Sequence, residues 1–227
     1  MLEESAVIYS DLGNDRGAAW SRTWSAWGAL HLGQNEQAQH RAENALVLFR
    51  EKASRYETGC ALSMLGMAAL AGAAPARAVE IFEQSVSLFR QLRTPEPLSR
   101  DLANLSLAVL ELGDIVRAQR LLAEALQINS EIRLPSMMRY VLAQTAPLLA
   151  ALGQPERAVA VYALAAQHSG LVANSRWFED VVGRQVTDAG AAVPPDVVVA
   201  AQARGRSWDL NGTVAELLTE FQGGAES

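Results

Sequence analysis

One phrase, a turn followed by an amphipathic stretch, returns along this chain at a constant spacing. Its central alanines, Ala38, Ala78, Ala118 and Ala158, are each 40 residues apart. Other columns hold their residue class in all four copies: apolar at 42, 82, 122 and 162, small at 45, 85, 125 and 165, and small at 26, 66, 106 and 146. Self-similarity at a fixed period of 20 to 50 residues is the signature of a repeat architecture. The chain is therefore predicted to fold as a stack of similar units.

Each unit is expected to consist of two antiparallel helices, which predicts an all-α, right-handed α-solenoid. Turn glycines separate the helices at Gly33, Gly113 and Gly153, with a slip of one residue to Gly72 in the second unit. The expected units are a half repeat at 1–14 and four full units at about 17–51, 57–91, 96–131 and 136–170. Residues that favour helix starts lie where the second helix of a unit should begin, and also where the first helix of the third unit should begin. They are Asn35, Asp114, Pro75, Pro155 and the Thr94-Pro95 pair.

The 40-residue period ends near residue 170, and residues 171–227 are expected to form a helical cap. An amphipathic stretch at 175–189 predicts one helix, the Pro194-Pro195 pair opens a second, and a third ends near Phe221. A terminal unit of a repeat array needs a polar outer face, which such a cap provides. The last residues, 223–227, are small and polar, and they are expected to fray.

The repeat columns resemble the tetratricopeptide repeat. Gly66, Ala78 and Phe82 match the small, alanine and aromatic positions of that motif, while Ser85 stands where alanine is usual. The usual period of that repeat is about 34 residues, so each unit here carries six more. The resemblance implies a scaffold that binds partners on the concave surface formed by the first helix of each unit.

Composition and charge argue against several function classes. Half of the residues are hydrophobic and the net charge is −6, without a basic stripe, so direct nucleic-acid binding is not expected. The longest apolar stretch, residues 62–76, is shorter than the roughly 20 residues of a membrane span. The first ten residues do not form an export signal. Together with a single cysteine, these features predict a cytoplasmic protein.

Residues that could support catalysis or metal binding are few and scattered. His31 and His40 lie nine residues apart across an expected helix boundary, with no cysteine or carboxylate at ligand spacing, and the third histidine is His168. Cys60 has no histidine nearby in sequence that would activate its thiol. The chain also lacks a phosphate-binding glycine loop. We therefore expect no catalytic residues, no metal and no cofactor, and predict that the chain is not an enzyme.

The tetratricopeptide resemblance places a set of side chains on the concave surface. Trp20, Trp24 and Trp27 share one helix face, at spacings of four and three. The candidate groove comprises these residues with nine others: His31, Cys60, Met64, Met67, Arg100, Asn104, Leu107, Tyr140 and Gln144. Tryptophan and tyrosine anchor interfaces and methionine lines adaptable grooves. The rings could alternatively be core, bind an amphipathic helix or apolar ligand, or receive an upstream domain.

The segments LEESAVIYSDLGNDRGAAW and AQARGRSWDLNGTVAELLTEF resemble the C-terminal repeat region of bacterial LuxR/MalT-like multidomain ATPase regulators. This resemblance implies a sensor or scaffold for transcription or signalling. Its partners would be a protein or peptide, an upstream ATPase domain of the same polypeptide, or a small effector. The initial half repeat suggests either a piece of a longer polypeptide or an N-terminal capping helix. The alternative role is an oligomerising array, such as a homodimer, that buries the tryptophan face between copies.

Overall fold

The computed structural model of the chain describes residues 2–167 and 170–223, and within these ranges all regular secondary structure is helical. The prediction of an all-α fold is confirmed. The repeat region contains α1 (Leu2–Asp11), α2 (Asp15–His31), α3 (Asn35–Glu51), α4 (Arg55–Ala71), α5 (Pro75–Leu92), α6 (Pro95–Glu111), α7 (Ile115–Ile132), α8 (Pro135–Ala151) and α9 (Pro155–Ala166).

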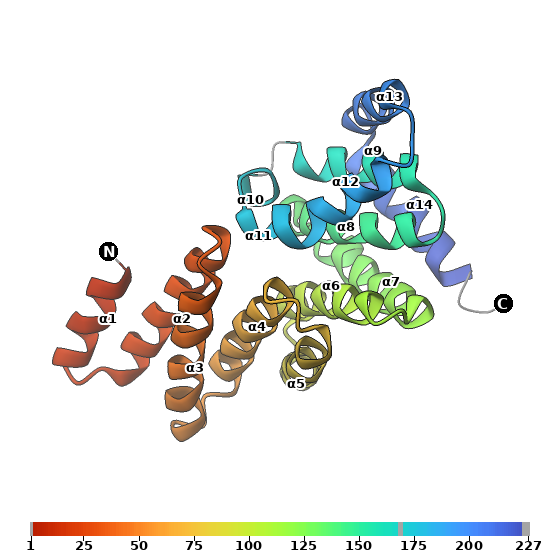
Figure 1. The fold of residues 1–227 in the computed structure, drawn as a ribbon. Coiled ribbons are helices and arrows are strands. Elements are labelled where there is room, and N and C mark those ends of the chain that lie inside the picture. The colour runs from red at the N-terminus through yellow and green to blue at the C-terminus, as the bar shows by residue number, and fades with distance from the viewer. Residues whose placement is uncertain (1, 168–169, 224–227) are drawn as a thin grey trace.

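The helices pack as repeating antiparallel pairs, α2 with α3, α4 with α5, α6 with α7 and α8 with α9 (Figure 1). The first helices, α2, α4, α6 and α8, also contact one another in sequence order, whereas the second helices are farther apart. The array therefore curves with the first helices on its concave side. Helix α1 packs against α2 as the second helix of an incomplete unit.

Helix starts recur every 20 residues, from Asp15 to Pro155. The side chains of Asn14 and Asp114 cap α2 and α7 by accepting from the backbone N–H of Gly17 and Arg117. Pro75 and Pro155 begin α5 and α9 as predicted. The prediction that Asn35 caps α3 is wrong, because the 20-residue step makes it the first helical residue and leaves Gln34 at the cap.

The turns between helices keep the same period in their backbone conformation. Left-handed φ angles occur at 13, 53, 93 and 133 and again at 33, 73, 113 and 153. In the second unit the left-handed residue is Ala73, with φ of 53°, whereas Gly72 has φ of −86°. The expected one-residue slip to Gly72 is therefore wrong: the backbone holds its register and an alanine adopts the conformation that favours glycine.

The repeat columns form the core. Ala38, Ala78, Ala118 and Ala158 are all fully buried. Gly66 lies so close to Phe82 that a Cβ there would be 2.6 Å from the phenylalanine ring. In the third unit the corresponding residues are Ser106 and Leu122. A larger side chain at the first position is thus matched by a smaller one at the second, so the two repeat positions compensate for each other in side-chain volume.

Ion pairs on the outer helices also follow the period. Arg77 pairs with Glu43 at 3.6 Å, and Arg117 pairs with Glu83 at 2.5 Å. The next arginine, Arg157, would meet position 123, which is alanine. It pairs instead with Glu216 and Glu220 of the last helix, α14 (Leu210–Gly223). Helix α14 thus supplies the negative charge that the repeat itself lacks at this place.

The C-terminal region begins with α10 (Gly170–Ala173) and continues through α11 (Arg176–Phe178), the π-helical turn η1 (Glu179–Gly183) and α12 (Arg184–Gly190). The expected helix at 175–189 therefore contains a π-helical segment. Helix α13 (Pro195–Arg206) starts at the predicted proline, and α14 ends two residues beyond Phe221. Of the residues expected to fray, 224–227 lie outside the described ranges, as does His168.

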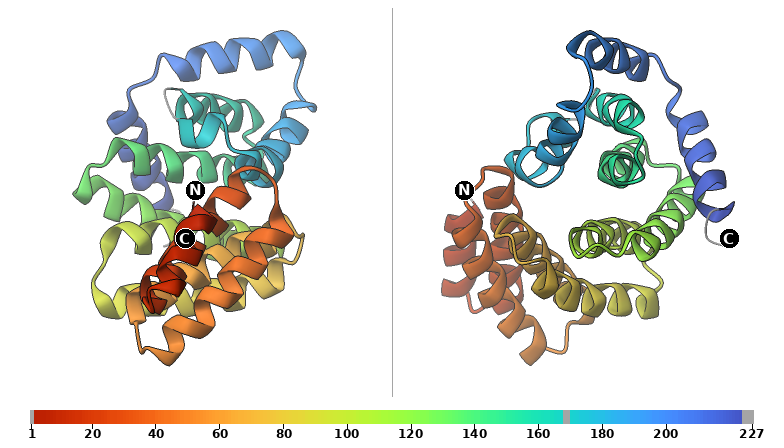
Figure 2. Two further views of the ribbon diagram at one scale, coloured as in Figure 1. Left: turned by 90° about the vertical axis from the view of Figure 1, so that its left-hand side faces the viewer. Right: turned by 45° about the vertical axis from the view of Figure 1, so that its right-hand side comes forward.

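These helices pack on two different sides of the array (Figure 2). Helix α13 lies along α9, and α14 lies along α7 and α8. The segment α11–η1–α12 contacts the first helices α2, α4 and α8, and its last helix, α12, also packs against α9. Part of the C-terminal region therefore occupies the concave side of the array, a placement that the expected terminal cap did not include.

Candidate binding site

An aromatic cavity, which we call the tryptophan pocket, lies on the concave side. It has a volume of about 370 Å³ and is lined by the N-terminal halves of α4, α6 and α8, together with Met64 near the middle of α4 and the middle and C-terminal half of α2. Its walls are mainly aromatic and apolar: Trp20, Thr23, Trp24, Trp27, Tyr56, Cys60, Met64, Glu96, Pro97, Arg100, Ser136, Met137 and Tyr140. Since all four units contribute, the pocket depends on the curvature of the whole array.

The three indoles of α2 meet edge to face rather than in a stack. The ring centroids of Trp20 and Trp24 are 5.9 Å apart at 84°, and those of Trp24 and Trp27 are 6.1 Å apart at 71°. Trp20 also contacts Phe49 of the core and Tyr56 across the pocket. Trp24 is 47% exposed, whereas Trp20 and Trp27 are half-buried. The row is therefore anchored in the core at one end and open to solvent in the middle.

An ion pair between the half-buried Arg100 and the buried Asp101 forms the polar floor of the tryptophan pocket. Asp101 is fully buried; its Oδ1 is 3.3 Å from Arg100 Nε, and its Oδ2 accepts from Ser63 Oγ at 2.5 Å. Burial raises the pKa of the Asp101 carboxyl, while the Arg100 guanidinium and the serine hydroxyls act in the opposite direction. Because the guanidinium is held by this carboxylate, its charge is largely compensated within the fold.

Deeper polar side chains hydrogen-bond to one another through Asn104, although Asn104 Nδ2 and Gln144 Oε1 are buried without a hydrogen-bond partner. Asn104 Oδ1 accepts from Tyr140 Oη and from Gln144 Nε2, both at 3.0 Å. Burial raises the pKa of Tyr140 to about 12. This network joins α6 to α8 beneath the pocket, and it removes Asn104 from any role as a free amide at the surface.

The chemistry of the pocket does not favour catalysis. Burial raises the pKa of the Cys60 thiol to about 11, which keeps it protonated and weakly nucleophilic at neutral pH. Within the described part of the chain, no group of three or more His, Cys, Asp or Glu side chains is placed to hold a metal ion. The arrangement is suited to recognition through apolar contact, ring faces and a few charges.

Seven of the twelve residues expected in the groove line the tryptophan pocket: Trp20, Trp24, Trp27, Cys60, Met64, Arg100 and Tyr140. The other five do not. Met67, Asn104, Leu107 and Gln144 are fully buried, and His31 is half-buried against the C-terminal segment. These five lie in the middle or the C-terminal halves of the first helices.

The segment α11–η1–α12 explains why the predicted groove is shorter than expected. Trp177 is buried and its Nε1 donates to the Met67 carbonyl at 2.9 Å. Phe178 meets Tyr140 edge to face with ring centroids 5.0 Å apart, and Ser175 Oγ is hydrogen-bonded to His31 Nδ1. Three helices of the concave side, α2, α4 and α8, are thus held by α11 and the residue that caps it, Ser175.

Some pocket residues were missed at the sequence level. Tyr56, Glu96 and Ser136 each stand four residues before a predicted groove residue, Cys60, Arg100 and Tyr140 respectively, and Met137 stands three before Tyr140. Helical side chains tilt toward the helix N-terminus, so the surface a residue covers lies over the preceding turn. Extending the predicted face by one turn toward the N-terminus would have included them.

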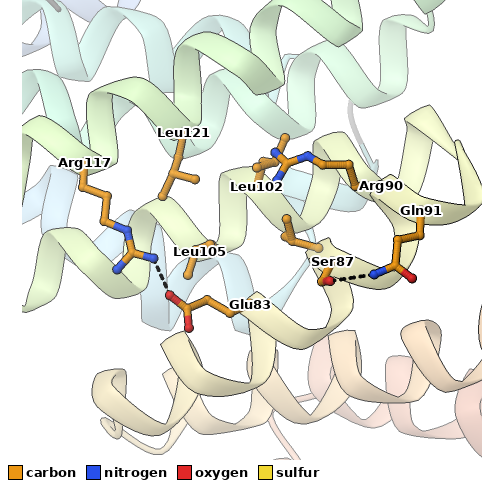
Figure 3. A pocket seen from close by; sticks show the side chains of 9 residues that line it. Glu83, Ser87, Arg90, Gln91, Leu102, Leu105, Arg117 and Leu121 are labelled. Atoms are coloured by element: carbon orange, nitrogen blue, oxygen red, sulfur yellow. Dashed lines mark hydrogen bonds and ion pairs between the residues drawn. The ribbon is translucent and has the colours of Figure 1, made fainter.

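Two other cavities differ in character. A shallow one of about 350 Å³ lies between α5, α6 and α7 (Figure 3). Leucines form its floor, and its sides carry the Arg117–Glu83 ion pair and the Gln91–Ser87 hydrogen bond. A wider cleft of about 1120 Å³ lies between α9, η1, α12 and α13. The first is a seam between repeats with ion-paired edges. The second lies outside the repeat face that the sequence pattern singles out.

Comparison with known proteins identifies the fold only. No protein-family model and no curated protein matches the chain. A crystal structure of a variant of a putative kinesin light chain from Podospora anserina, with nearly identical TPR-like repeats, is similar with a TM-score of 0.52 and 20% sequence identity. The match covers 89% of this chain and 92% of that one. The chain therefore has a tetratricopeptide-like helical-repeat fold, and among its described helices none is long and apolar enough to cross a membrane.

Proposed function

We propose that the chain is a non-catalytic binding module and that the tryptophan pocket is its recognition site. The observation that carries this proposal is the division of the concave side. Part of that side is covered by α11–η1–α12, whereas the remaining aromatic cavity contains a 47% exposed tryptophan and is lined by all four repeat units. Exposed tryptophan in a concave, largely apolar site is typical of interface anchors.

The surrounding structure supports a preformed site. Trp20 packs on Phe49, and Arg100 is held by Asp101, so these walls are fixed before a partner binds. A preorganised surface loses less conformational entropy on association, and more of the contact energy then appears as affinity. The volume suits one or two side chains of a protein or peptide, or a small effector, rather than a whole helix.

We further propose that this module is the sensor or interaction region of a bacterial transcriptional or signalling regulator. The basis is the resemblance of the segments at 2–20 and 201–221 to the repeat regions of multidomain ATPase regulators. In that setting, occupancy of the pocket would bias an ATPase domain of the same polypeptide. A cytoplasmic location follows from this proposal.

Selection from a random peptide display library on the immobilised protein provides a direct test. Peptides that bind are then measured by calorimetry against the wild type, Trp24→Ala and the control Val47→Ala, which removes an apolar side chain that is 57% exposed on α3. Trp24→Ala should weaken binding at least about tenfold, as expected for an interface anchor. Equal affinity for the wild type and Trp24→Ala would contradict the proposed site.

Sedimentation at several concentrations tests the alternative role as an oligomerising array. The proposal predicts a monomer throughout for both the wild type and Trp24→Ala. A wild-type dimer that dissociates on Trp24→Ala substitution would instead assign the tryptophan face to an interface between two copies.

A further inference from the structure

We propose that the tryptophan pocket recognises a fully alkylated ammonium group, such as trimethylammonium, carried by a small metabolite or by a methylated lysine of a partner. This inference deepens the proposed function and rests on it. It follows from three properties of the pocket: the density of aromatic rings, the balance of charge, and the scarcity of hydrogen-bond acceptors.

Five aromatic side chains converge on one small cavity: Trp20, Trp24, Trp27, Tyr56 and Tyr140. A cation near an aromatic face is attracted by the ring quadrupole, most strongly by tryptophan, and the attraction grows when the site excludes water. Three tryptophans around about 370 Å³ therefore favour a cation over a neutral group of the same shape. Trp24, which is the most exposed of the three, gives the ligand its route of entry.

The charges near the pocket leave a negative balance. Among the described residues of the lining, Arg100 is the only cationic side chain, and its guanidinium is paired with the fully buried Asp101. Glu96 also lines the pocket, and across residues 2–167 and 170–223 it forms no ion pair. One uncompensated carboxylate at an exposed position then attracts a cationic ligand and repels an anionic one.

The polar groups of the lining favour an alkylated nitrogen over a primary ammonium. A lysine ammonium has three N–H donors, each of which needs an acceptor when it is desolvated. The Glu96 carboxylate is the one charged acceptor of the lining, and the other oxygen acceptors are neutral hydroxyls, those of Thr23, Tyr56, Ser136 and Tyr140. Most of the remaining walls are rings, Met64, Met137 and Pro97. A nitrogen covered by methyl groups keeps its charge and presents an apolar surface to these walls.

A ligand series of constant shape isolates the contribution of charge. Choline, the neutral 3,3-dimethylbutan-1-ol and the anionic 3,3-dimethylbutanoate are titrated into the full chain, with indole fluorescence and calorimetry as readouts. Choline should bind at least about tenfold more tightly than the alcohol, and the carboxylate should bind most weakly. Equal binding of choline and the alcohol would overturn the inference but leave a pocket that binds apolar groups. Preference for the carboxylate would also overturn the inference.

The source of the group is distinguished by a second pair of probes. A short peptide containing trimethyl-lysine is compared with choline and with the same peptide containing unmodified lysine. Tighter binding of the trimethylated peptide than of choline assigns the site to a modified partner, whereas the reverse assigns it to a small metabolite. Equal binding of the two peptides would contradict recognition of the alkylated nitrogen.

Substitutions then locate the interaction. Glu96→Gln should reduce choline affinity several-fold, whereas the control Glu36→Gln, which removes an exposed carboxylate of α3 with the same change in net charge, should leave it unchanged. Trp24→Phe retains a ring and should bind choline more tightly than Trp24→Ala.

If choline binds but Glu36→Gln lowers the choline affinity as much as Glu96→Gln does, the attraction comes from the overall charge of the protein and the assigned site is wrong. If none of the probes binds while selected peptides still require Trp24, this inference fails and the proposed function stands.

Discussion

At the scale of single residues, His31 shows how the C-terminal segment changes the chemistry of the concave side. Its ring contacts Trp27 with centroids 4.0 Å apart, and its Nδ1 is hydrogen-bonded to Ser175. Burial lowers its pKa from 6.5 to about 4. The imidazole is therefore neutral in the folded protein over a pH range in which the unfolded chain binds a proton, and its titration is linked to stability.

The free energy of unfolding should consequently depend on pH through His31. Because its folded pKa lies below the unfolded value, the full stability holds above pH 6.5 and is lost as the pH falls toward 4. The loss due to His31 should be about 1–3 kcal/mol. Urea unfolding at several pH values should show a smaller loss for His31→Asn than for the wild type. The control His40→Gln retains His31 and should follow the wild type; an identical pH dependence of all three would contradict the assignment.

The pairing of Gly66 with Phe82 gives a second prediction at this scale. A Cβ on Gly66 would lie 2.6 Å from the ring, so Gly66→Ser alone should destabilise the protein by about 1–3 kcal/mol through overpacking. The double variant Gly66→Ser with Phe82→Leu reproduces the Ser106 and Leu122 of the third unit and should recover most of this loss. Thermal unfolding of the two single variants and the double variant measures the coupling. Additive losses would show that the two positions do not compensate.

At the scale of elements, the periodic part of the fold could be predicted from sequence, whereas the site could be predicted only in part. The alanine columns and helix-starting prolines determine which segments are helical and where the pairs lie. The wall of the pocket formed by Trp20, Trp24 and Trp27 was predicted from their shared helix face and from the tetratricopeptide resemblance, which places that face on the concave side. The segment at 175–190 carries no repeat signal, because it packs by specific contacts such as Trp177 on Met67 rather than by a repeated face. No periodic pattern could have placed it on the concave side.

Trp177 should therefore be a major determinant of stability. It is 1% exposed and donates its indole N–H to the Met67 carbonyl. Trp177→Ala should cost about 3–5 kcal/mol. Trp177→Phe retains most of the buried area but leaves the Met67 carbonyl without this donor, so it should cost about 1–3 kcal/mol. Chemical denaturation measures the free energy of unfolding of the wild type and both variants. A smaller loss for Trp177→Ala than for Trp177→Phe would contradict the packing described.

At the scale of the whole molecule, the C-terminal segment links parts of the array that are distant in sequence. In an open solenoid each unit contacts only its neighbours, and stability is nearly a sum of local terms. Here α11 contacts α2, while Phe178 at its end contacts Tyr140 of α8. The first and fourth units are thereby coupled through a segment that belongs to neither. We expect this coupling to maintain the curvature that brings the four first helices together around the tryptophan pocket.

Hydrogen exchange measures that coupling. In Trp177→Ala, amide exchange should increase in α2 as well as in α11 and α4, because the loosened segment no longer holds the first unit. Helix α5, which faces the outside of the second unit, should change least. An increase confined to α11 and α4 would show that the array behaves as an open solenoid despite the contact between α11 and α2.

The central claim, that the tryptophan pocket is where this protein recognises its partner, is tested most directly by fluorine NMR of the 5-fluorotryptophan-labelled chain. The five tryptophans give five resonances, assigned by single substitution, and a ligand selected on the wild type is then added. We predict that Trp20, Trp24 and Trp27 shift on binding while Trp208, which lies in the turn between α13 and α14, does not. Shifts at Trp208 without shifts in the three pocket tryptophans would contradict the claim.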